Sequence, residues 1–178
     1  MSETIHLQTP LRAEDIQKLR AGDAVALSGK IYTARDAAHK RLVEMLERGE
    51  TMPFVFGGAA VFYAGPCPNR PGEVIGSIGP TTSGRMDAYS PTLMRQGLRV
   101  MIGKGNRNKA VVQAIRETGG VYLAAIGGIA ALMSACVTEV RTIAFEDLGT
   151  EAIRELTVHE LPLVVAIDSL GGSVYQEG

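Results

Sequence analysis

The sequence is poor in cysteine and contains no tryptophan. Cys67 and Cys136 are its only two cysteines among 178 residues. Two cysteines cannot form the disulfide framework that staples small secreted domains. They also cannot by themselves supply the four ligands of a structural zinc site or of an ordinary iron–sulfur cluster. We therefore expect a protein of a reducing compartment, the cytoplasm.

Long apolar runs and an excess of one charge are missing as well. No apolar stretch approaches the roughly 18 residues that a transmembrane helix needs, and the first residues lack the basic start and apolar stretch of a signal peptide. Lys and Arg together number 18 and Asp and Glu number 19, which gives a net charge of −1. This balance gives no electrostatic reason to expect nucleic acid or a membrane as a partner.

The composition that remains is that of a globular protein. Apolar residues make up 46% and charged residues 21% of the chain, close to the globular average. A chain of 178 residues corresponds to about one domain and can bury a sizeable core without disulfides. No linker, repeat or low-complexity run interrupts it. The sequence therefore predicts a single compact domain over residues 1–178.

The hydrophobic pattern changes along the chain. Near the N-terminus, Ala24–Leu27 and Lys30–Tyr32 read as two strands joined by a tight turn at Ser28-Gly29. From about residue 90 onward strands alternate with helices, as in the strand Leu98–Ile102, a helix from Asn106 to Glu117 and the strand Val121–Ala125. This alternation is typical of crossover units beside a mostly parallel sheet. The predicted fold is α/β with mixed sheets.

The densest chemical signal lies between Gly79 and Asp87, in the order Gly-Pro-Thr-Thr-Ser-Gly-Arg-Met-Asp. If a helix begins near Thr82, its free N–H groups and positive dipole end face any bound anion. Thr81 and Thr82 add hydroxyl groups, and Arg85 is suited to gripping a carboxylate with two hydrogen bonds. Simple capping of a helix by these hydroxyls, without a ligand, remains an alternative.

Two further cations stand at places where ligands bind. Lys104 lies between two glycines at a strand end, which is where open α/β sheets usually bind ligands, although a solvated loop lysine is the more frequent case. Arg35 lies in the first turn of a helix predicted from Arg35 to Arg48, where the helix dipole disfavours a cation. The unfavourable choice of Arg35 hints at function. His39, on the same helix, is interpreted as a residue without a role.

The glycine pair Gly127-Gly128 follows a strand and precedes a stretch of small residues. It lacks the order Gly-x-Gly-x-x-Gly and the downstream acidic residue of a dinucleotide site, so we exclude nicotinamide binding. Lys104 likewise lacks the spacing of a phosphate-binding P-loop. The residues alone therefore indicate an α/β domain whose cations and hydroxyls suit a small dianion.

Taken together, these segments resemble the beta subunit, or C-terminal domain, of class I fumarate hydratase, a family that also contains L-tartrate dehydratase. The resemblance covers nearly the whole chain. The matching segments are residues 33–40, 64–66, 79–87, 103–107, 119–128 and 146–152, with Asp168 near the end.

The resemblance implies a hydro-lyase that reversibly adds water to fumarate to give L-malate. Such enzymes use an oxygen-sensitive four-iron four-sulfur cluster whose three cysteine ligands belong to the alpha part, so a partner alpha subunit is expected to carry it. Neither Cys67 nor Cys136 matches a ligand position, and no metal is expected to be held by this chain. The implied fold is a swivelling β/β/α domain.

Carried over by position, Arg35, Arg85 and Lys104 resemble the family's substrate-carboxylate binders. Thr81 resembles a residue proposed to transfer a proton at the carbon next to the carboxylate, and Thr82 assists by hydrogen bonding. The Arg-Met-Asp ending at Asp87 resembles the fumarase form, whereas tartrate dehydratases carry Arg-Met-Glu. We therefore favour fumarate as the substrate over tartrate.

Two readings from other functional classes stay open. The chain is then either a stand-alone, non-catalytic module that binds small dicarboxylates, or a structural subunit that caps another protein. A surface made to cover a partner is partly apolar, and exposed apolar patches tend to pair. A homodimer of the isolated chain is therefore a further expectation.

Overall fold

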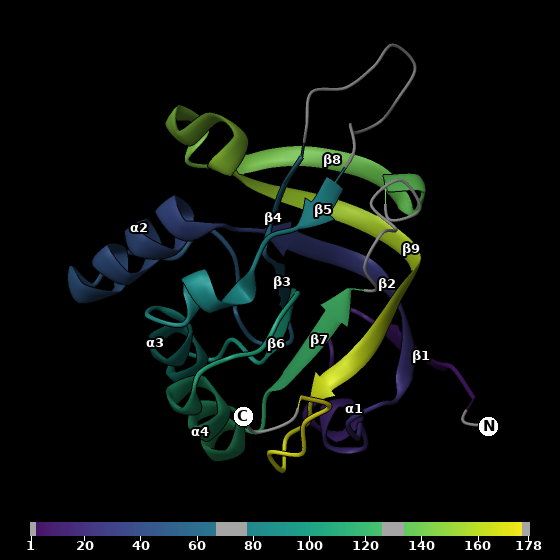
Figure 1. Ribbon diagram of the computed structural model, residues 1–178. Coiled ribbons are helices and arrows are strands. Elements are labelled where there is room, and N and C mark those ends of the chain that lie inside the picture. Colours follow the sequence, from purple (N-terminus) through teal and green to yellow (C-terminus); the bar gives the residue numbers. More distant parts are fainter. Residues whose placement is uncertain (1–2, 67–77, 126–133, 176–178) are drawn as a thin grey trace.

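The computed structural model describes residues 3–66, 78–125 and 134–175, built around a seven-stranded sheet (Figure 1). The strands of this sheet are β1 (Ile5–Gln8), β2 (Ala24–Thr33), β3 (Ala60–Phe62), β6 (Val100–Gly103), β7 (Val121–Ala125), β8 (Val137–Ala144) and β9 (Ile153–Ile167). A second sheet pairs β4 (Ala64–Pro66) with β5 (Ile78–Pro80). The helices are α1 (Ala13–Gln17), α2 (Asp36–Glu47), α3 (Ser90–Arg95) and α4 (Lys109–Thr118), with 3₁₀ turns η1 (Ser83–Met86) and η2 (Glu146–Glu151).

The large sheet closes on itself. Its strand order is β1-β2-β3-β6-β7-β9-β8, and β2 also pairs with β9. A closed ring is therefore formed by β2, β3, β6, β7 and β9. Strand β1 pairs with β2 and strand β8 pairs with β9, and neither is needed to close the ring. Pairings from β1 through β7 are parallel, whereas β9 runs antiparallel to β2, β7 and β8. The predicted single α/β domain with a mixed sheet is confirmed.

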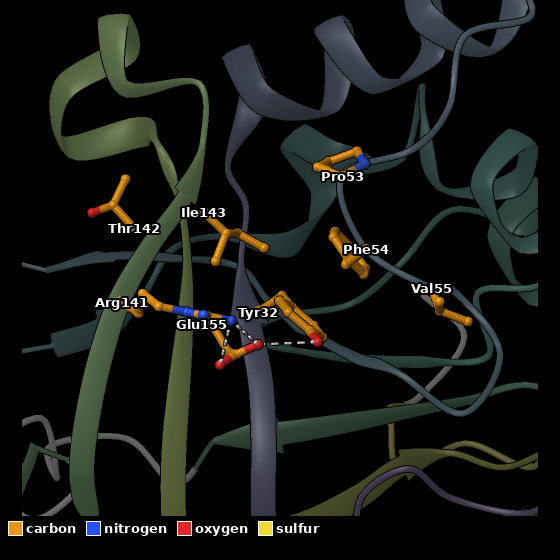
Figure 2. A pocket seen from close by; sticks show the side chains of 8 residues that line it. All are labelled: Tyr32, Pro53, Phe54, Val55, Arg141, Thr142, Ile143 and Glu155. Carbon is orange, nitrogen blue, oxygen red and sulfur yellow. Dashed lines mark hydrogen bonds and ion pairs between the residues drawn. The ribbon is translucent and has the colours of Figure 1, made fainter.

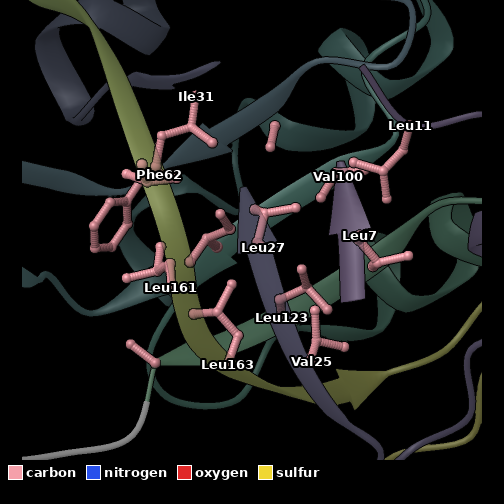
Figure 3. Close-up of a cluster of buried hydrophobic side chains, with 14 of the residues drawn as sticks. Leu7, Leu11, Val25, Leu27, Ile31, Phe62, Val100, Leu123, Leu161 and Leu163 are labelled. Carbon is pink, nitrogen blue, oxygen red and sulfur yellow. The ribbon is translucent and has the colours of Figure 1, made fainter. Parts of the chain in front are cut away.

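Two hydrophobic clusters lie on the two faces of this ring. One fills its interior, where side chains such as Leu27, Leu123 and Leu163 meet (Figure 3). The other lies outside it, between the sheet and helices α2, α3 and α4. Strand β6 shows the alternation, because Val100 and Ile102 belong to the inner cluster and Met101 to the outer one. Burial on both faces explains why the parallel strands are almost continuously apolar.

The prediction of a hairpin at Ser28-Gly29 is wrong. Strand β2 runs unbroken from Ala24 to Thr33, and its pairing with β9 shifts register between Leu27 and Gly29. Gly29 has a φ of 107°, a conformation that glycine adopts without strain. The glycine therefore makes a β-bulge within one strand instead of a turn between two.

The helices match the expected pattern more closely. The helix predicted from Arg35 to Arg48 is found as α2, and the strand Val121–Ala125 is found as β7. Helix α4 begins later than predicted, because the Asn108 side chain caps it by accepting a 2.9 Å hydrogen bond from the Val111 N–H. Helix α3 was not predicted. None of the described helices is long and apolar enough to span a membrane.

Candidate functional site

The carboxyl ends of the parallel strands place two predicted cations at one edge of the sheet. Strands β2, β3, β6 and β7 run parallel and therefore end on the same side, the usual position of ligand sites in such sheets. Arg35 follows the last residue of β2 by two positions, and Lys104 directly follows β6. The chain between them is tied together, because Ala34 N–H donates to Phe62 O at 3.0 Å and Tyr63 N–H donates to Ile102 O at 2.8 Å.

The threonine pair lies beside Lys104. Thr81 N–H donates to Tyr63 O at 2.8 Å. Thr82 forms a parallel bridge with Lys104, and the next residue, Ser83, donates its N–H to Lys104 O at 2.9 Å. The segment that carries both threonines therefore runs along the end of β6.

Arg85 links this segment to helix α2. Its Nε lies 2.9 Å from Oδ2 of Asp36, the first residue of α2 and the chain neighbour of Arg35. The structure thus gathers Arg35, Thr81, Thr82, Arg85 and Lys104, which are separated by up to 69 positions in the sequence, at one edge of the sheet. Their roles toward a substrate stay predictions.

The cations at this edge are weakly compensated. Among the described residues, neither the Arg35 nor the Lys104 side chain forms an ion pair, and Arg85 pairs only with Asp36. Lys104 is exposed, and the Arg85 side chain is 54% exposed. Exposed cations without partners attract anionic ligands. The edge therefore has the electrostatic character that a dicarboxylate site needs.

The anion-binding helix expected near Thr82 is absent. Ser83 begins the four-residue 3₁₀ turn η1 instead, which is too short to build a macrodipole comparable to that of an α-helix. The hydroxyls of Thr81 and Thr82 form no hydrogen bond among the described residues. The prediction that a helix dipole binds an anion here is therefore wrong. The positive charge at this edge comes from side chains.

Buried polar atoms without hydrogen-bond partners concentrate at the start of α2. Within the described part of the chain four such side-chain atoms occur, and three of them are Arg35 Nε, Asp36 Oδ1 and His39 Nε2. Most buried polar atoms in native proteins are paired, so such a cluster calls for an explanation. One explanation is that a ligand or a partner chain completes the site and supplies the missing hydrogen-bond partners.

His39, which was interpreted from the sequence as a helix residue without a role, belongs to this cluster. It is fully buried, its Nδ1 lies 2.9 Å from Arg35 O, and its ring meets the Tyr63 ring edge-on at 5.2 Å. Burial lowers the pKa of His39 to about 4, so the imidazole is neutral near pH 7. A neutral ring that donates from Nδ1 supports the backbone at Arg35.

A buried arginine that the sequence analysis did not single out supports the other half of the site. Arg107 Nε donates to Asp87 Oδ1, and its Nη2 donates to Ser90 Oγ at 2.8 Å and to Tyr63 Oη at 3.2 Å. The second Asp87 oxygen accepts a 2.7 Å hydrogen bond from Asn108 N–H. Arg107 therefore ties the segment after η1 to the loop that carries Lys104. A lone basic residue in a loop gives no sequence signal for this role.

Tyr122 fixes the same two segments from strand β7. Its hydroxyl lies 2.6 Å from Ser83 Oγ and 2.7 Å from Gly105 O. Burial raises the pKa of Tyr122, so the phenol stays protonated and able to donate. Ser83 is fully buried, and its hydroxyl therefore holds the fold of the loop.

A separate hollow lies between β2, β8 and the chain at Pro53–Val55 (Figure 2), with a volume of about 480 Å³. None of the five predicted site residues lines it. Three of its polar groups are paired with one another, because Arg141 and Tyr32 both approach the Glu155 carboxylate, at 3.3 and 3.5 Å. The hollow is therefore distinct from the edge that carries the uncompensated cations.

The described residues do not fit an iron–sulfur cluster. They contain one cysteine, Cys136, and burial raises the pKa of its thiol, which disfavours the thiolate that binds metal. No group of three or more His, Cys, Asp or Glu side chains gathers within residues 3–66, 78–125 and 134–175. Cys67 and Gly127-Gly128, which the sequence analysis discussed, lie outside the described residues.

Comparisons with known proteins show the family of the chain. The chain is 42% identical to a putative L(+)-tartrate dehydratase subunit beta of Methanocaldococcus jannaschii, over 94% of this chain and 89% of that protein. It is 36% identical to fumarate hydratase 2 of Leishmania major and 37% identical to the aerobic class I fumarate hydratase of Escherichia coli. Those matches cover 92% and 86% of this chain, which spans only 29% and 28% of these longer relatives. The family described as fumarase C-terminus matches residues 1–178, and the chain belongs to it.

Proposed function

We propose that this chain is the beta part of a hydro-lyase that interconverts fumarate and L-malate. The observation that carries the proposal is the gathering of Arg35, Arg85 and Lys104 beside the Thr81-Thr82 pair at one edge of the sheet. The fumarate hydratase names of similar proteins support it. The reaction class fits the geometry, because a four-carbon dianion presents two carboxylates to several cations.

The cations stabilise charge that develops during the reaction. When a proton leaves the carbon next to a carboxylate, negative charge grows on that carboxylate. Preorganised cations aimed at this charge lower the barrier, because they need no rearrangement at the moment of reaction. Arg35, Arg85 and Lys104 take this role in our proposal.

Thr81 holds the reacting proton, with Thr82 assisting by a hydrogen bond. A neutral hydroxyl is a weak base and needs a group that accepts its own proton. Among the described residues the Thr81 hydroxyl has no hydrogen-bond partner. In our proposal the partner subunit supplies the accepting group.

The partner alpha subunit also carries the four-iron four-sulfur cluster in our proposal. Cys136 is the one cysteine among the described residues. When bound, the open iron of such a cluster supplies a Lewis acid toward the hydroxyl that is added or removed. This chain contributes the carboxylate-binding half of the shared site.

Fumarate is the proposed substrate, with L-tartrate as the second candidate that the M. jannaschii relative's name favours. The Asp87 carboxylate, which resembles the fumarase pattern, is occupied by Arg107 and the Asn108 N–H. Asp87 therefore influences the substrate through the position of the loop and without direct contact. Measuring kcat/KM for fumarate, L-malate and L-tartrate decides between the two.

Anaerobic mixing of this chain with its alpha partner tests the proposal. We expect hydration of fumarate by the mixture and none by either chain alone. Turnover by this chain alone in the absence of iron contradicts the proposal. Calorimetry on the isolated chain with fumarate, L-malate and tartrate separates the binding-module reading, which predicts micromolar binding without a partner.

Self-association of the isolated chain is part of the same proposal. The surface that covers the alpha subunit is free in the isolated chain, and apolar parts of such a surface pair readily. Light scattering over a concentration series is expected to show a homodimer, and a monomer throughout contradicts this.

A further inference from the structure

We infer that Asp36 is a positioning residue that fixes the Arg85 guanidinium for binding a substrate carboxylate. This inference rests on the proposed function. Asp36 is the first residue of α2, and its Oδ2 lies 2.9 Å from Arg85 Nε. The contact joins two segments that are 49 positions apart in the sequence.

The contact uses only one side of the guanidinium. Asp36 engages Nε of Arg85, and the two terminal nitrogens have no partner among the described residues. These terminal nitrogens form a planar fork that binds a carboxylate through two parallel hydrogen bonds. Arg85 is therefore held at its base while its binding end stays free.

Arg85 needs such support because no other side-chain contact among the described residues restrains it. Its side chain is 54% exposed and stands on the short turn η1, next to Gly84. A long, free side chain loses conformational entropy when it binds a ligand, and restraint before binding reduces that loss. The Asp36 contact supplies the restraint.

Asp36 is itself a firm anchor. It belongs to a helix of 12 residues, and a carboxylate in the first turn is favoured by the helix dipole. Its second oxygen, Oδ1, is buried. The helix therefore sets the position of this carboxylate, and the carboxylate in turn orients the Arg85 guanidinium.

A simple charge argument predicts the opposite effect of removing Asp36. The Asp36 carboxylate reduces the positive charge near Arg35 and Arg85, so its loss makes the site more positive and strengthens the attraction for a dianion. Loss of positioning instead weakens binding. The sign of the change in substrate affinity therefore distinguishes a positioning role from a background charge.

The test compares Asp36→Asn, Arg85→Ala and the double variant in the complex with the alpha partner. We expect Asp36→Asn to raise KM by about tenfold and also to lower kcat, because a misplaced Arg85 binds the substrate carboxylate less well and stabilises less of the charge that develops in the transition state. In the Arg85→Ala background, Asp36→Asn is expected to have no further effect, because it acts through Arg85. A lower KM in Asp36→Asn, or an effect that persists without Arg85, overturns the inference.

Asp147→Asn is the matched control. Asp147 forms two 2.8 Å hydrogen bonds with Arg41, another residue of α2, so this variant removes a carboxylate and an arginine contact of the same kind away from Arg85. We expect its KM to equal that of the wild-type complex. A rise like that of Asp36→Asn shows a general charge effect and also overturns the inference.

A second measurement does not depend on turnover. In nitrogen-15 spectra of the chain, the Nε–H of Arg85, assigned by its loss in Arg85→Lys, is expected to exchange slowly with water and to exchange faster in Asp36→Asn. An exchange rate that Asp36→Asn leaves unchanged rejects the positioning contact. If the wild-type complex does not hydrate fumarate, the proposed function fails while this measurement still decides whether Asp36 holds Arg85.

Discussion

Arg107 Nε lies 2.6 Å from Asp87 Oδ1, and the two side chains are only 0% and 9% exposed. The pair joins the segment that carries the threonines and Arg85 to the loop that carries Lys104. The Arg107 guanidinium also lies 5.0 Å from the centre of the Tyr63 ring and 4.8 Å from that of Tyr122. A buried charge with this set of partners fixes the relative position of the two segments.

Replacement of Asp87 by Asn is expected to destabilise the fold. The variant leaves the buried Arg107 charge without its counter-ion, and breaking a buried pair in this way costs about 3 kcal/mol or more in the free energy of unfolding. Urea unfolding measures the loss. Asp147→Asn, which breaks the exposed pair with Arg41, is expected to cost much less, and equal losses in the two variants contradict the structural role of Asp87.

Arg85→Ala and Lys104→Ala are each expected to lower kcat/KM of the complex by about two orders of magnitude or more, the scale seen when preorganised charge stabilisation is removed. Both side chains are exposed, so thermal stability is expected to stay close to that of the wild type. Arg48→Ala serves as a control, because Arg48 lies at the far end of α2 and pairs with Glu50. Unchanged turnover in the two site variants favours a purely structural subunit.

The buried His39 is expected to make stability depend on pH. Its pKa is lowered from 6.5 to about 4, chiefly by burial. Between these values the unfolded chain binds more protons than the folded one, so the free energy of unfolding falls as pH drops below 6.5 and levels off below about 4. The total loss from this group is about 3 kcal/mol.

Denaturant unfolding from pH 7.5 to pH 4 measures this slope. In His39→Asn the side-chain amide still donates to Arg35 O but does not titrate, so the slope is expected to become flatter. A slope as steep as that of the wild type shows that another group causes the pH dependence.

Gly103→Ala is expected to displace the buried side chains that support the site. A Cβ atom at Gly103 meets Ser83 Oγ and lies 2.8 Å from Tyr63 Cδ2, both of them in a buried region. Overpacking of this kind costs about 2 kcal/mol, and displacement of Ser83 is expected to lower turnover through the neighbouring Thr82. Gly57→Ala is the control, because a Cβ there meets nothing within 4 Å; similar losses in both variants contradict the prediction.

Local patterns in the sequence were sufficient for several elements. The helix predicted from Arg35 to Arg48 and the strand predicted at Val121–Ala125 are both present in the structure. The interpretation failed at Ser28-Gly29, where glycine makes a bulge within β2. A bulge and a turn need the same backbone freedom, and only the distant pairing of β2 with β9 distinguishes them.

The candidate site shows the same division. Arg35, Arg85 and Lys104 were conspicuous because each stands at an unusual local position in the chain. Arg107 was not, because its importance comes from burial between Tyr63 and Tyr122. Burial of a charge depends on contacts between segments that are distant in sequence, and no local pattern reports it.

The sequence by itself determined the α/β class, most of the regular elements and the residue types able to hold a small dianion. Only the tertiary structure decided that these residues meet. Parallel strands end at one edge, which places Arg35 near Lys104, and the contact between Arg85 and Asp36 joins the remaining segment. The physical reason is that closure of the sheet and pairing of charges depend on long-range contacts, whereas helix and strand patterns depend on neighbours in the chain.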